Sequence, residues 1–265
     1  MEESHLVAAM AGLPLGPLRF FKTISSTNDE AARWAEQGAP DLALVFADEQ
    51  TAGRGRAGRR WFTSASVALA FSLVLRFDRS GDSSGLMAGI SALGSLAVSD
   101  ALIQHYALAA QIKWPNDVLV NRKKLAGVLA EAHWQGDRLS AVILGIGVNV
   151  TRQAVPSPES LIYPATSVQD ETDQPVERLE LLRHILSALL LRRVSLGTEE
   201  FLYAWEERLA FRGEWVQLSG QDTLLEGWLA GLGRDGALRL VTTAGQEVAV
   251  YTGDVRLRPL GPEYK

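Results

Sequence analysis

Residues 50–61 constrain the fold of this chain more than any other stretch. They read Gln-Thr-Ala-Gly-Arg-Gly-Arg-Ala-Gly-Arg-Arg-Trp and follow an apolar run at residues 42–47 that predicts a buried strand. The three glycines let the backbone turn tightly and approach a ligand, and the free N–H groups of such a turn can form a nest for an anion. The four arginines carry a permanent charge on a planar fork of donors that matches carboxylate and phosphate. The fold must therefore bring a buried strand to a loop that suits an anion.

Three interpretations of this loop compete. A solvated basic loop is the usual form of a charge run. A dinucleotide fingerprint is the second, because Gly53, Gly55 and Gly58 fit the pattern G-x-G-x-x-G. The context opposes this interpretation. Arginines occupy the positions between the glycines, where a dinucleotide-binding loop has small apolar residues. The acidic residue expected about 20 positions further on, which would bind the ribose, is Asp78, and it lies in a predicted turn. The third interpretation is a lid over an acyl-phosphate, which the rest of the chain favours.

Composition excludes several classes of protein. The 265 residues, 47% hydrophobic and 22% charged, are typical of a soluble protein with one large domain or one large and one small domain. A net charge of −5 gives no general attraction to nucleic acid, so a cationic site must be local. The absence of cysteine excludes disulfides, thiolate metal sites and cysteine nucleophiles. The acidic N-terminus, with no apolar stretch near the 18 residues needed to span a bilayer, predicts a cytoplasmic protein.

The pattern of apolar residues predicts a large domain of mixed strands and helices. A helix at residues 25–38 is expected to be capped by Ser26 or Thr27 and to end at Gly38. Residues 151–174 are rich in Pro, Ser, Thr, Gln and Asp and predict a surface loop. The other predicted helices are 85–108, 175–193 and 198–209, and the predicted strands are 18–24, 42–47, 67–77, 111–114, 118–120, 125–134 and 139–150.

The pattern changes after residue 212. Only short strands follow, at residues 215–218, 224–232, 237–242, 246–251 and 254–258, with turns such as 219–222 between them. About 50 residues of this kind indicate a small antiparallel barrel. The predicted division is a leader at 1–17, a catalytic domain at 18–211 and a barrel at 212–265.

Three further segments carry polar side chains suited to chemistry. Lys113-Trp-Pro-Asn-Asp117 places Asn116 and Asp117 at a strand end, where they either hold Mg²⁺ or form a plain turn. Lys124 begins a buried strand and either points into a cleft or is solvated beside its neighbouring lysine. The glycines of residues 145–149 indicate either a ligand lying against the strand or a kinked core strand. The sequence contains no P-loop, no G-x-S-x-G elbow and no histidines at metal-ligand spacing.

These segments, in this order and spacing, resemble the motifs of biotin–protein ligases. The motifs are Ser25-Ser-Thr-Asn28, Gln50 with Gly53-Arg-Gly-Arg-Ala-Gly-Arg-Arg-Trp61, Lys113-Trp-Pro-Asn-Asp117, Lys124-Leu-Ala-Gly127 and Gly145-Ile-Gly-Val-Asn149. The resemblance implies an α/β (α+β) fold with a mixed-sheet, class II synthetase-like catalytic domain and a small SH3-like antiparallel β-barrel. It also implies the form of the family that lacks an N-terminal DNA-binding domain.

The resemblance implies a two-step reaction. The carboxylate of biotin attacks the α-phosphate of ATP, and a lysine of the carrier protein then attacks biotinyl-AMP and releases AMP. Residues 53–58 are expected to order over the intermediate and exclude water. The residues implied are Lys124, Arg54 and Asp117 for catalysis; Ser26, Thr27, Asn28, Gln50, Gly53, Arg54, Gly55, Arg56, Lys124, Gly127 and Gly145 for biotin; Arg56, Arg59, Trp61, Asn116, Lys124 and Asn149 for ATP; and Asp117 for Mg²⁺ and for accepting a proton from, or orienting, the attacking amine.

The implied partner is a biotin carboxyl carrier protein or the carrier domain of a carboxylase such as acetyl-CoA carboxylase. Related ligases pair through the sheet of the catalytic domain, so a homodimer is expected, with no DNA and no membrane as partners. The alternative functions are a lipoate or octanoate ligase or transferase of the same fold and a biotin-responsive regulator that binds DNA.

Overall fold

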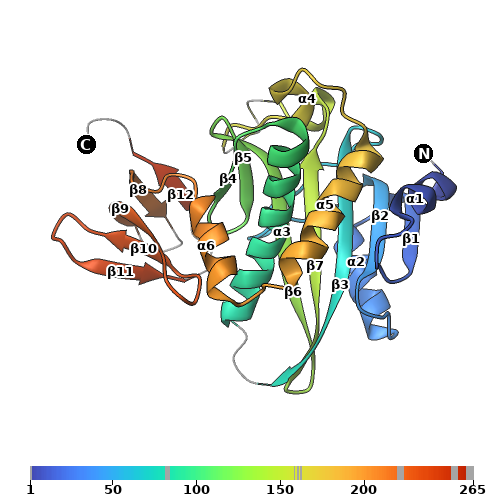
Figure 1. Cartoon of the computed structure of the whole chain (residues 1–265), viewed down its shortest axis with the longest axis horizontal. Coiled ribbons are helices and arrows are strands. Elements are labelled where there is room, and N and C mark those ends of the chain that lie inside the picture. Colours follow the sequence, from blue (N-terminus) through green and yellow to red (C-terminus); the bar gives the residue numbers. More distant parts are fainter. Residues whose placement is uncertain are drawn as a thin grey trace.

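The protein contains two β-sheets that follow one another along the chain (Figure 1). The computed structural model describes residues 2–80, 84–157, 159, 161, 163–219, 224–251 and 256–260. The first sheet has seven strands in the order β1-β2-β3-β7-β6-β5-β4, with β1 parallel to β2 and each other neighbouring pair antiparallel. The second is antiparallel, with five strands in the order β11-β10-β9-β8-β12. The mixed α/β class predicted from the sequence is confirmed.

The observed elements agree closely with the predicted ones. The strands are β1 (Leu18–Ile24), β2 (Ala43–Gln50), β3 (Ala68–Ser80), β4 (Ala110–Lys113), β5 (Asp117–Val120), β6 (Lys123–Gln135), β7 (Arg138–Asn149), β8 (Trp215–Ser219), β9 (Leu224–Leu232), β10 (Leu238–Val241), β11 (Glu247–Val250) and β12 (Arg256–Pro259). The helices are α1 (Glu3–Met10), α2 (Thr27–Glu36), α3 (Ser84–Tyr106), α4 (Val168–Glu171), α5 (Arg178–Arg193) and α6 (Glu199–Glu207), with a 3-10 turn, η1, at Arg152–Ala154.

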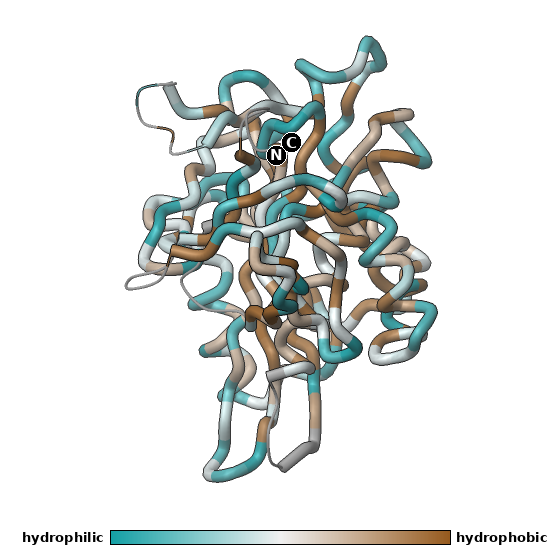
Figure 2. Tube along the Cα trace, turned by 90° about the vertical axis from the view of Figure 1, so that its left-hand side faces the viewer, coloured by the Kyte–Doolittle hydropathy of each residue, from teal (hydrophilic) through white to brown (hydrophobic). Residues whose placement is uncertain are grey.

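The seven-stranded sheet lies between helices on both faces. Successive side chains of a strand point to opposite faces. Leu44 and Phe46 of β2 therefore join the large core cluster that includes α3 and α5. Val45, between them, packs in a second cluster with Ala31 and Ala35 of α2. Figure 2 shows hydrophobic residues concentrated in the interior of the molecule and hydrophilic residues at the peripheral turns.

The start of α2 is fixed by its own sequence. The side chain of Ser26 accepts a hydrogen bond from the backbone N–H of Asp29, which is the N-cap predicted from the sequence. Gly38, just past the helix, has a φ of 88°, which glycine adopts without steric cost. Since β1 runs parallel to β2 with Ile24 opposite Gln50, the start of α2 lies beside the end of β2. This register brings the first two polar motifs of the chain together.

The C-terminal sheet is attached to the catalytic part through buried contacts. The indole N–H of Trp114 donates to the carbonyl of Gly236, with 3.1 Å between nitrogen and oxygen. A side chain on Gly236 would press on the ring of Trp205 of α6, so the close approach requires glycine there. The five strands expected in this region are present, and their closure into a barrel stays a prediction. The turn predicted at 219–222 and the beginning of the strand predicted at 254–258 lie largely outside the described residues.

The N-terminal segment predicted as a leader contains α1. Leu6 and Met10 of this helix are buried in the main core. The guanidinium of Arg183 on α5 donates to the carbonyls of Ala9 and Ala11, at 2.6 and 2.9 Å. The helix therefore packs against the catalytic part, while the domain boundaries at 17/18 and 211/212 stay predictions.

The expectation that no stretch is long and apolar enough to cross a bilayer is wrong for α3. By length and composition, Gly85–Tyr106 is long and apolar enough to cross a bilayer. In the structure 72% of an 18-residue window within it is buried. Because α3 packs against both the sheet and α5, most of its surface is interior, which explains its largely apolar composition.

The expectation of a surface loop at residues 151–174 is also wrong in part. This segment contains η1 and α4, and Thr166, Ser167 and Val168 are buried. The N–H of Lys124 donates to the carbonyl of Pro164 at 2.8 Å, and the N–H of Thr166 donates to the carbonyl of Lys124 at 2.9 Å. These bonds join backbone groups far apart in the chain, so the polar composition of the segment does not predict them.

The contact between α3 and α5 predicts a pH dependence of stability. The rings of His105 and His184 stack with centroids 3.5 Å apart. Burial and then the neighbouring His105 lower the pKa of His184 from its ordinary value of 6.5, against the opposing charge of Glu180. The neutral ring is therefore favoured in the folded protein. Its stabilisation is fully present above about pH 6.5 and is lost as pH falls through the lower folded-state value.

We expect His184→Gln to reduce the fall in melting temperature between about pH 7.5 and about pH 5.5, because the unfolded chain then gains one proton fewer. Thermal melting followed by circular dichroism measures this. His133→Gln, a change of the same kind on β6, is the control. Equal pH slopes for wild type and His184→Gln would contradict the assignment.

Candidate active site

The floor of the site is formed by two adjacent strands that bring three glycines together. Gly127 of β6 lies directly opposite Gly147 of β7, and Gly145 lies opposite Leu129. A side chain on Gly147 would collide with the indole of Trp61, and one on Gly145 would collide with the amide of Asn28. The glycines thus let other groups, and by the same geometry a ligand, lie flat against the backbone. A cavity of about 110 Å³ lies over this floor.

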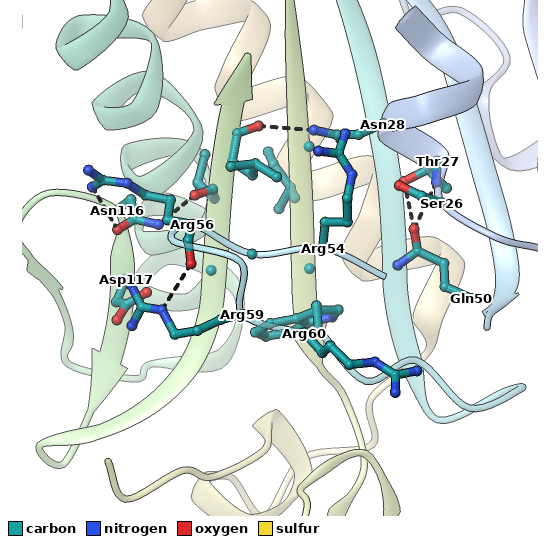
Figure 3. A pocket seen from close by; sticks show the side chains of 18 of the residues that line it. Ser26, Thr27, Asn28, Gln50, Arg54, Arg56, Arg59, Arg60, Asn116 and Asp117 are labelled. Atoms are coloured by element: carbon teal, nitrogen blue, oxygen red, sulfur yellow. Dashed lines mark hydrogen bonds between the residues drawn. The ribbon is translucent and has the colours of Figure 1, made fainter. Parts of the chain in front are cut away.

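The roof is formed by residues 53–61, which we call the glycine–arginine loop. The loop folds back on itself, with the N–H of Gly55 donating to the carbonyl of Arg59 at 2.7 Å and that of Trp61 to the carbonyl of Gly53 at 2.9 Å. Gly58 at its tip has a φ of 67°. Figure 3 shows the loop crossing the strands, with Arg54 reaching toward Asn28 and Arg56 toward Asn116.

One end of the cavity is polar but uncharged. The N–H and the hydroxyl of Thr27 both donate to the side-chain oxygen of Gln50, at 2.8 and 3.1 Å. The hydroxyl of Ser72 lies 2.8 Å from that of Thr27 and donates to the side-chain oxygen of Asn28 at 2.6 Å. Ser26, Thr27 and Asn28 are all buried. Buried neutral groups with a fixed hydrogen-bond pattern suit a neutral polar ligand, because a charged ligand would lose its hydration there.

Beside this end, two carboxylates hold Arg54. Its guanidinium donates to both carboxylate oxygens of Glu131 at 2.7 Å and lies 2.7 Å from Asp29. Asn28 donates to the same carboxylate of Glu131 at 2.7 Å. Burial lowers the pKa of Arg54, but its contacts with Glu131 and Asp29 outweigh that effect and raise it. The catalytic role of Arg54 stays a prediction, and its donors face carboxylates in this structure.

The opposite end of the cavity is cationic. The ammonium of Lys124 lies 2.5 Å from one oxygen of Asp117, and that of Lys113 lies 3.4 Å from the other. Burial raises the pKa of Asp117, but Lys124 and Lys113 outweigh it and hold the pKa below its ordinary value. Burial lowers the pKa of Lys113 to about 8, although Asp117 acts in the opposite direction. Asp117 is therefore a carboxylate at neutral pH, suited to fixing the two ammonium groups and poorly suited to accepting a proton.

Two arginines of the loop extend this cationic end. Arg56 donates to the side-chain oxygen of Asn116 at 3.4 Å, and Arg59 donates to the carbonyl of Arg56 at 3.0 Å. Asn116 is itself held by Val128, with its amide donating to the Val128 carbonyl at 2.6 Å. The segment of Lys113 to Asp117 and the loop thus meet over the start of β6.

A second cavity of about 380 Å³ shares Trp61, Asp117 and Lys124 with the first. It includes Asn149, whose amide donates to the carbonyl of Thr166 at 3.0 Å. The ammonium of Lys113 lies 4.3 Å from the centre of the Tyr163 ring, which also lines this cavity. Cations beside an aromatic ring suit a ligand that combines an anion with a flat base.

The structure brings the predicted residues together with few exceptions. The first cavity is lined by every residue predicted for biotin except Gly53, which lies in the loop behind it, and by Arg59, Trp61, Asn116 and Asp117. Asn149 lies in the second cavity instead. The site residues that the sequence did not assign include Ser72, Glu131, Gly147, Lys113 and Tyr163. Ser72 and Glu131 carried a signal, because each places a polar side chain within a strand of mostly apolar residues.

The described residues contain no group of three His, Asp or Glu side chains that could hold a metal ion. Asp117 was predicted as a Mg²⁺ ligand, but both of its oxygens contact ammonium groups. A Mg²⁺ site needs several oxygen ligands in octahedral geometry. The surroundings of Asp117 therefore fit an ion pair better than a metal ligand.

Comparisons with known proteins show which family this chain resembles. The model of the biotin/lipoate A/B protein ligase family matches residues 20–149. A biotin–[acetyl-CoA-carboxylase] ligase of Paracoccus denitrificans is 38% identical, and the match covers 84% of this chain and 93% of the relative. The bifunctional ligase/repressor BirA of Bacillus spizizenii is 32% identical, with 88% and 72% covered. The structure of the biotin protein ligase from Aquifex aeolicus in complex with biotin and ATP superposes with a TM-score of 0.77 at 29% identity, covering 92% of this chain and 99% of that one. The resemblance predicted from the motifs is confirmed.

The glycine floor predicts the effect of one added methyl group. Gly147→Ala places a carbon where the indole of Trp61 lies, so the glycine–arginine loop must lift. We expect the free energy of unfolding to fall by about 1–3 kcal/mol and the amides of residues 53–61 to exchange faster with deuterium. Hydrogen exchange with mass spectrometry measures the second effect.

Gly85→Ala on α3 is the matched control, because the nearest atom to its added carbon lies 3.8 Å away. If both variants exchange like the wild type in the loop, the close packing of Trp61 on Gly147 does not hold in solution.

Proposed function

The chain belongs to the biotin/lipoate A/B protein ligase family, and we propose that it joins biotin to a carrier protein through biotinyl-AMP. ATP drives the first step, and a lysine of a biotin carboxyl carrier protein or domain, as in acetyl-CoA carboxylase, receives the biotin. One observation carries the proposal: a single cavity joins a neutral hydrogen-bonding end to a cationic end over a glycine floor. The names of the relatives favour biotin over lipoate or octanoate.

The neutral end suits the ureido ring of biotin, which has two N–H donors, one carbonyl acceptor and no charge. Ser26, Thr27 and Gln50 supply fixed partners for such a ring. The aliphatic tail then runs along the flat backbone of Gly145 and Gly127, beside the side chains of Asn28 and Trp61. This orientation brings the carboxylate of biotin to the ammonium of Lys124.

The first step brings two anions together, so their repulsion must be neutralised. Lys124, Arg56 and Arg59 provide positive charge at the cationic end, while Lys113 adds charge from the side of the second cavity. Preorganised cations stabilise the charge that grows on the phosphoryl oxygens. Mg²⁺ that accompanies the phosphates of ATP would add to this neutralisation. Its ligands are then mainly phosphate and water, since Asp117 already contacts two ammonium groups.

Asp117 has a positioning role in this proposal. It fixes Lys124 by a contact of 2.5 Å and remains ionised, because the two lysines hold its pKa low. A carboxylate of this kind orients an incoming lysine of the carrier by hydrogen bonding. Of the two roles predicted for Asp117 in the transfer step, the geometry favours orienting the amine over accepting its proton.

The C-terminal sheet also contributes to the second cavity. Arg258 of β12 lies with its guanidinium 4.7 Å from the centre of the Tyr163 ring, on the side that we assign to the nucleotide. We propose that the C-terminal strands close as an SH3-like barrel, with a domain boundary between residues 211 and 212. A homodimer and a cytoplasmic location are part of the same proposal, which rests for both on the resemblance.

Calorimetry of biotin, with and without MgATP, tests the proposed function. We expect biotin to bind the wild type, MgATP to produce biotinyl-AMP, and Lys124→Ala to slow adenylate formation by about 100-fold, since it removes a cation preorganised for the transition state. Lys123→Ala is the matched control, because the ammonium of Lys123, the residue before Lys124, contacts Glu171 outside the cavity.

Lipoate and octanoate are titrated in parallel. Binding of either one in place of biotin would reverse the choice of substrate. No binding of biotin under any condition would reject the ligase.

The pKa of Lys113 predicts a pH effect on the use of ATP. Burial lowers this pKa to about 8, so the ammonium loses its charge as pH rises through that value. We expect the KM for ATP in adenylate formation to increase by roughly three- to tenfold above about pH 8, since one cation near the phosphates is then lost. Initial rates of pyrophosphate release measure it.

Two variants test whether loss of the Lys113 charge causes the increase in the KM for ATP. Lys113→Arg keeps its charge and is expected to flatten the profile. Asp117→Asn removes the carboxylate that raises the pKa of Lys113, so the increase in KM should move to lower pH. A wild-type KM that stays constant through this range would show that Lys113 does not act on ATP.

A further inference from the structure

We propose that Glu131 and Asp29 are positioning residues that hold Arg54, and through it the glycine–arginine loop, closed over the reaction intermediate. The proposal deepens the proposed function and rests on it for the identity of the retained intermediate. It assigns Arg54 to holding the loop rather than to neutralising phosphate. The loop closes when the guanidinium of Arg54 binds the carboxylates of Glu131 on β6 and Asp29 on α2.

The contacts of Arg54 join three parts of the fold. Both carboxylate oxygens of Glu131 on β6 accept from its guanidinium at 2.7 Å, and Asp29, in the first turn of α2, lies at the same distance. Within the loop, Arg54 pairs with Arg60 as an isolated antiparallel bridge. Fixing Arg54 therefore fixes both sides of the loop at once. The planar fork of arginine makes the paired contact with one carboxylate, which lysine lacks the geometry to make.

The charges in this cluster oppose a role in binding phosphate. One guanidinium faces two carboxylates, so the cluster of Arg54, Asp29 and Glu131 has a net charge of −1. At the other end of the cavity, two lysines face Asp117, and the balance there is +1. A phosphate is drawn to the second cluster and repelled by the first. Arg54 would have to leave both carboxylates before it met an anion.

Glu131 also connects the loop to the neutral end of the cavity. The amide of Asn28 donates to Glu131 at 2.7 Å, and the same amide lies against Gly145 in the floor. Glu131 thus contacts one residue at the neutral end of the cavity and one residue of its roof. A ligand that holds Asn28 in place also holds the carboxylate on which Arg54 docks. Binding in the cavity and closure of the loop are coupled through this one side chain.

The strength of the contact suits a closure that reverses in each reaction cycle. The side chains of Arg54, Asp29 and Glu131 are 41%, 43% and 29% exposed. Ion pairs open to water are weak and are screened by salt. A partly exposed pair can hold the loop while the intermediate is present and release it for the product. Closure that excludes water also protects an acyl-adenylate from hydrolysis.

Glu131→Gln tests the proposal, because it keeps the hydrogen bond to Asn28 and removes the charge that holds Arg54. Two measurements are made. Trypsin cleavage after residues 54, 56, 59 and 60, located by mass spectrometry, reports opening of the loop in the ligand-free protein. Release of biotinyl-AMP into excess unlabelled biotin reports retention of the intermediate. We expect both rates to increase about tenfold.

Glu214→Gln is the matched control. Glu214 accepts two hydrogen bonds from Arg122 at 2.9 Å in a similarly exposed pair outside both cavities. We expect this variant to behave like the wild type in both measurements. Arg54→Lys, which keeps the charge and loses the fork, is expected to behave like Glu131→Gln, and Asp29→Asn is expected to show a smaller effect in the same direction.

Some results would overturn the proposal. The first is that Glu131→Gln is cleaved and retains the intermediate like Glu214→Gln. The second is that Glu131→Gln lowers the KM for ATP, which would mean that Glu131 restrains Arg54 from binding phosphate. The third is that Arg54→Ala and Glu131→Gln add in the double variant, since residues acting through one contact do not add. If the wild type makes no biotinyl-AMP, the proposed function fails, while the trypsin measurement still decides whether Glu131 holds the loop.

Discussion

The antiparallel register of β6 and β7 is the constraint on which the rest of the site depends. It sets Gly127 opposite Gly147 in the middle of the sheet and leaves a strip of bare backbone. Trp61 from the loop lies on this strip, and Asn28 from the start of α2 lies on Gly145 beside it. A shift of the register by one residue would turn branched side chains into the cavity, because side chains alternate between the faces of a sheet. The floor, the roof and the polar end are all aligned by this one pairing.

Electrostatics then divides the cavity along its length. Neutral hydrogen-bonding groups gather where α2 begins beside the end of β2, and the lysines gather where β5 and β6 begin. The carboxylates have different tasks at the two ends. Asp117 holds two lysines in place and stays ionised, while Glu131 and Asp29 hold one arginine of the loop. A ligand with a neutral polar ring at one end and an anion at the other matches this division, as biotin joined to AMP does.

Much of the fold could be predicted because its signals are local. The cap of α2 at Ser26, the glycines that end turns, and the change to short strands after residue 212 all arise from neighbouring residues. The errors came where tertiary packing prevails. α3 is apolar enough for a membrane span because most of it is buried, and residues 166–168 are buried beside the backbone pairing with Lys124. The apolar composition of α3 is visible in a window of sequence, but its burial and the backbone pairing with Lys124 are not.

The sequence by itself determined the inventory of chemistry: four arginines on a glycine-rich loop, two lysines near an acid, and glycines inside strands. Only the tertiary structure decided which partner each charge takes. Arg54 is predicted from the sequence as a catalytic and biotin-binding residue, yet it pairs with Glu131, which lies 77 residues away in the chain. Lys113 is an ordinary lysine in the sequence, and burial lowers its pKa to about 8. The physical reason is that ion pairing and desolvation act over a few ångströms, and the fold alone determines which groups come within that distance.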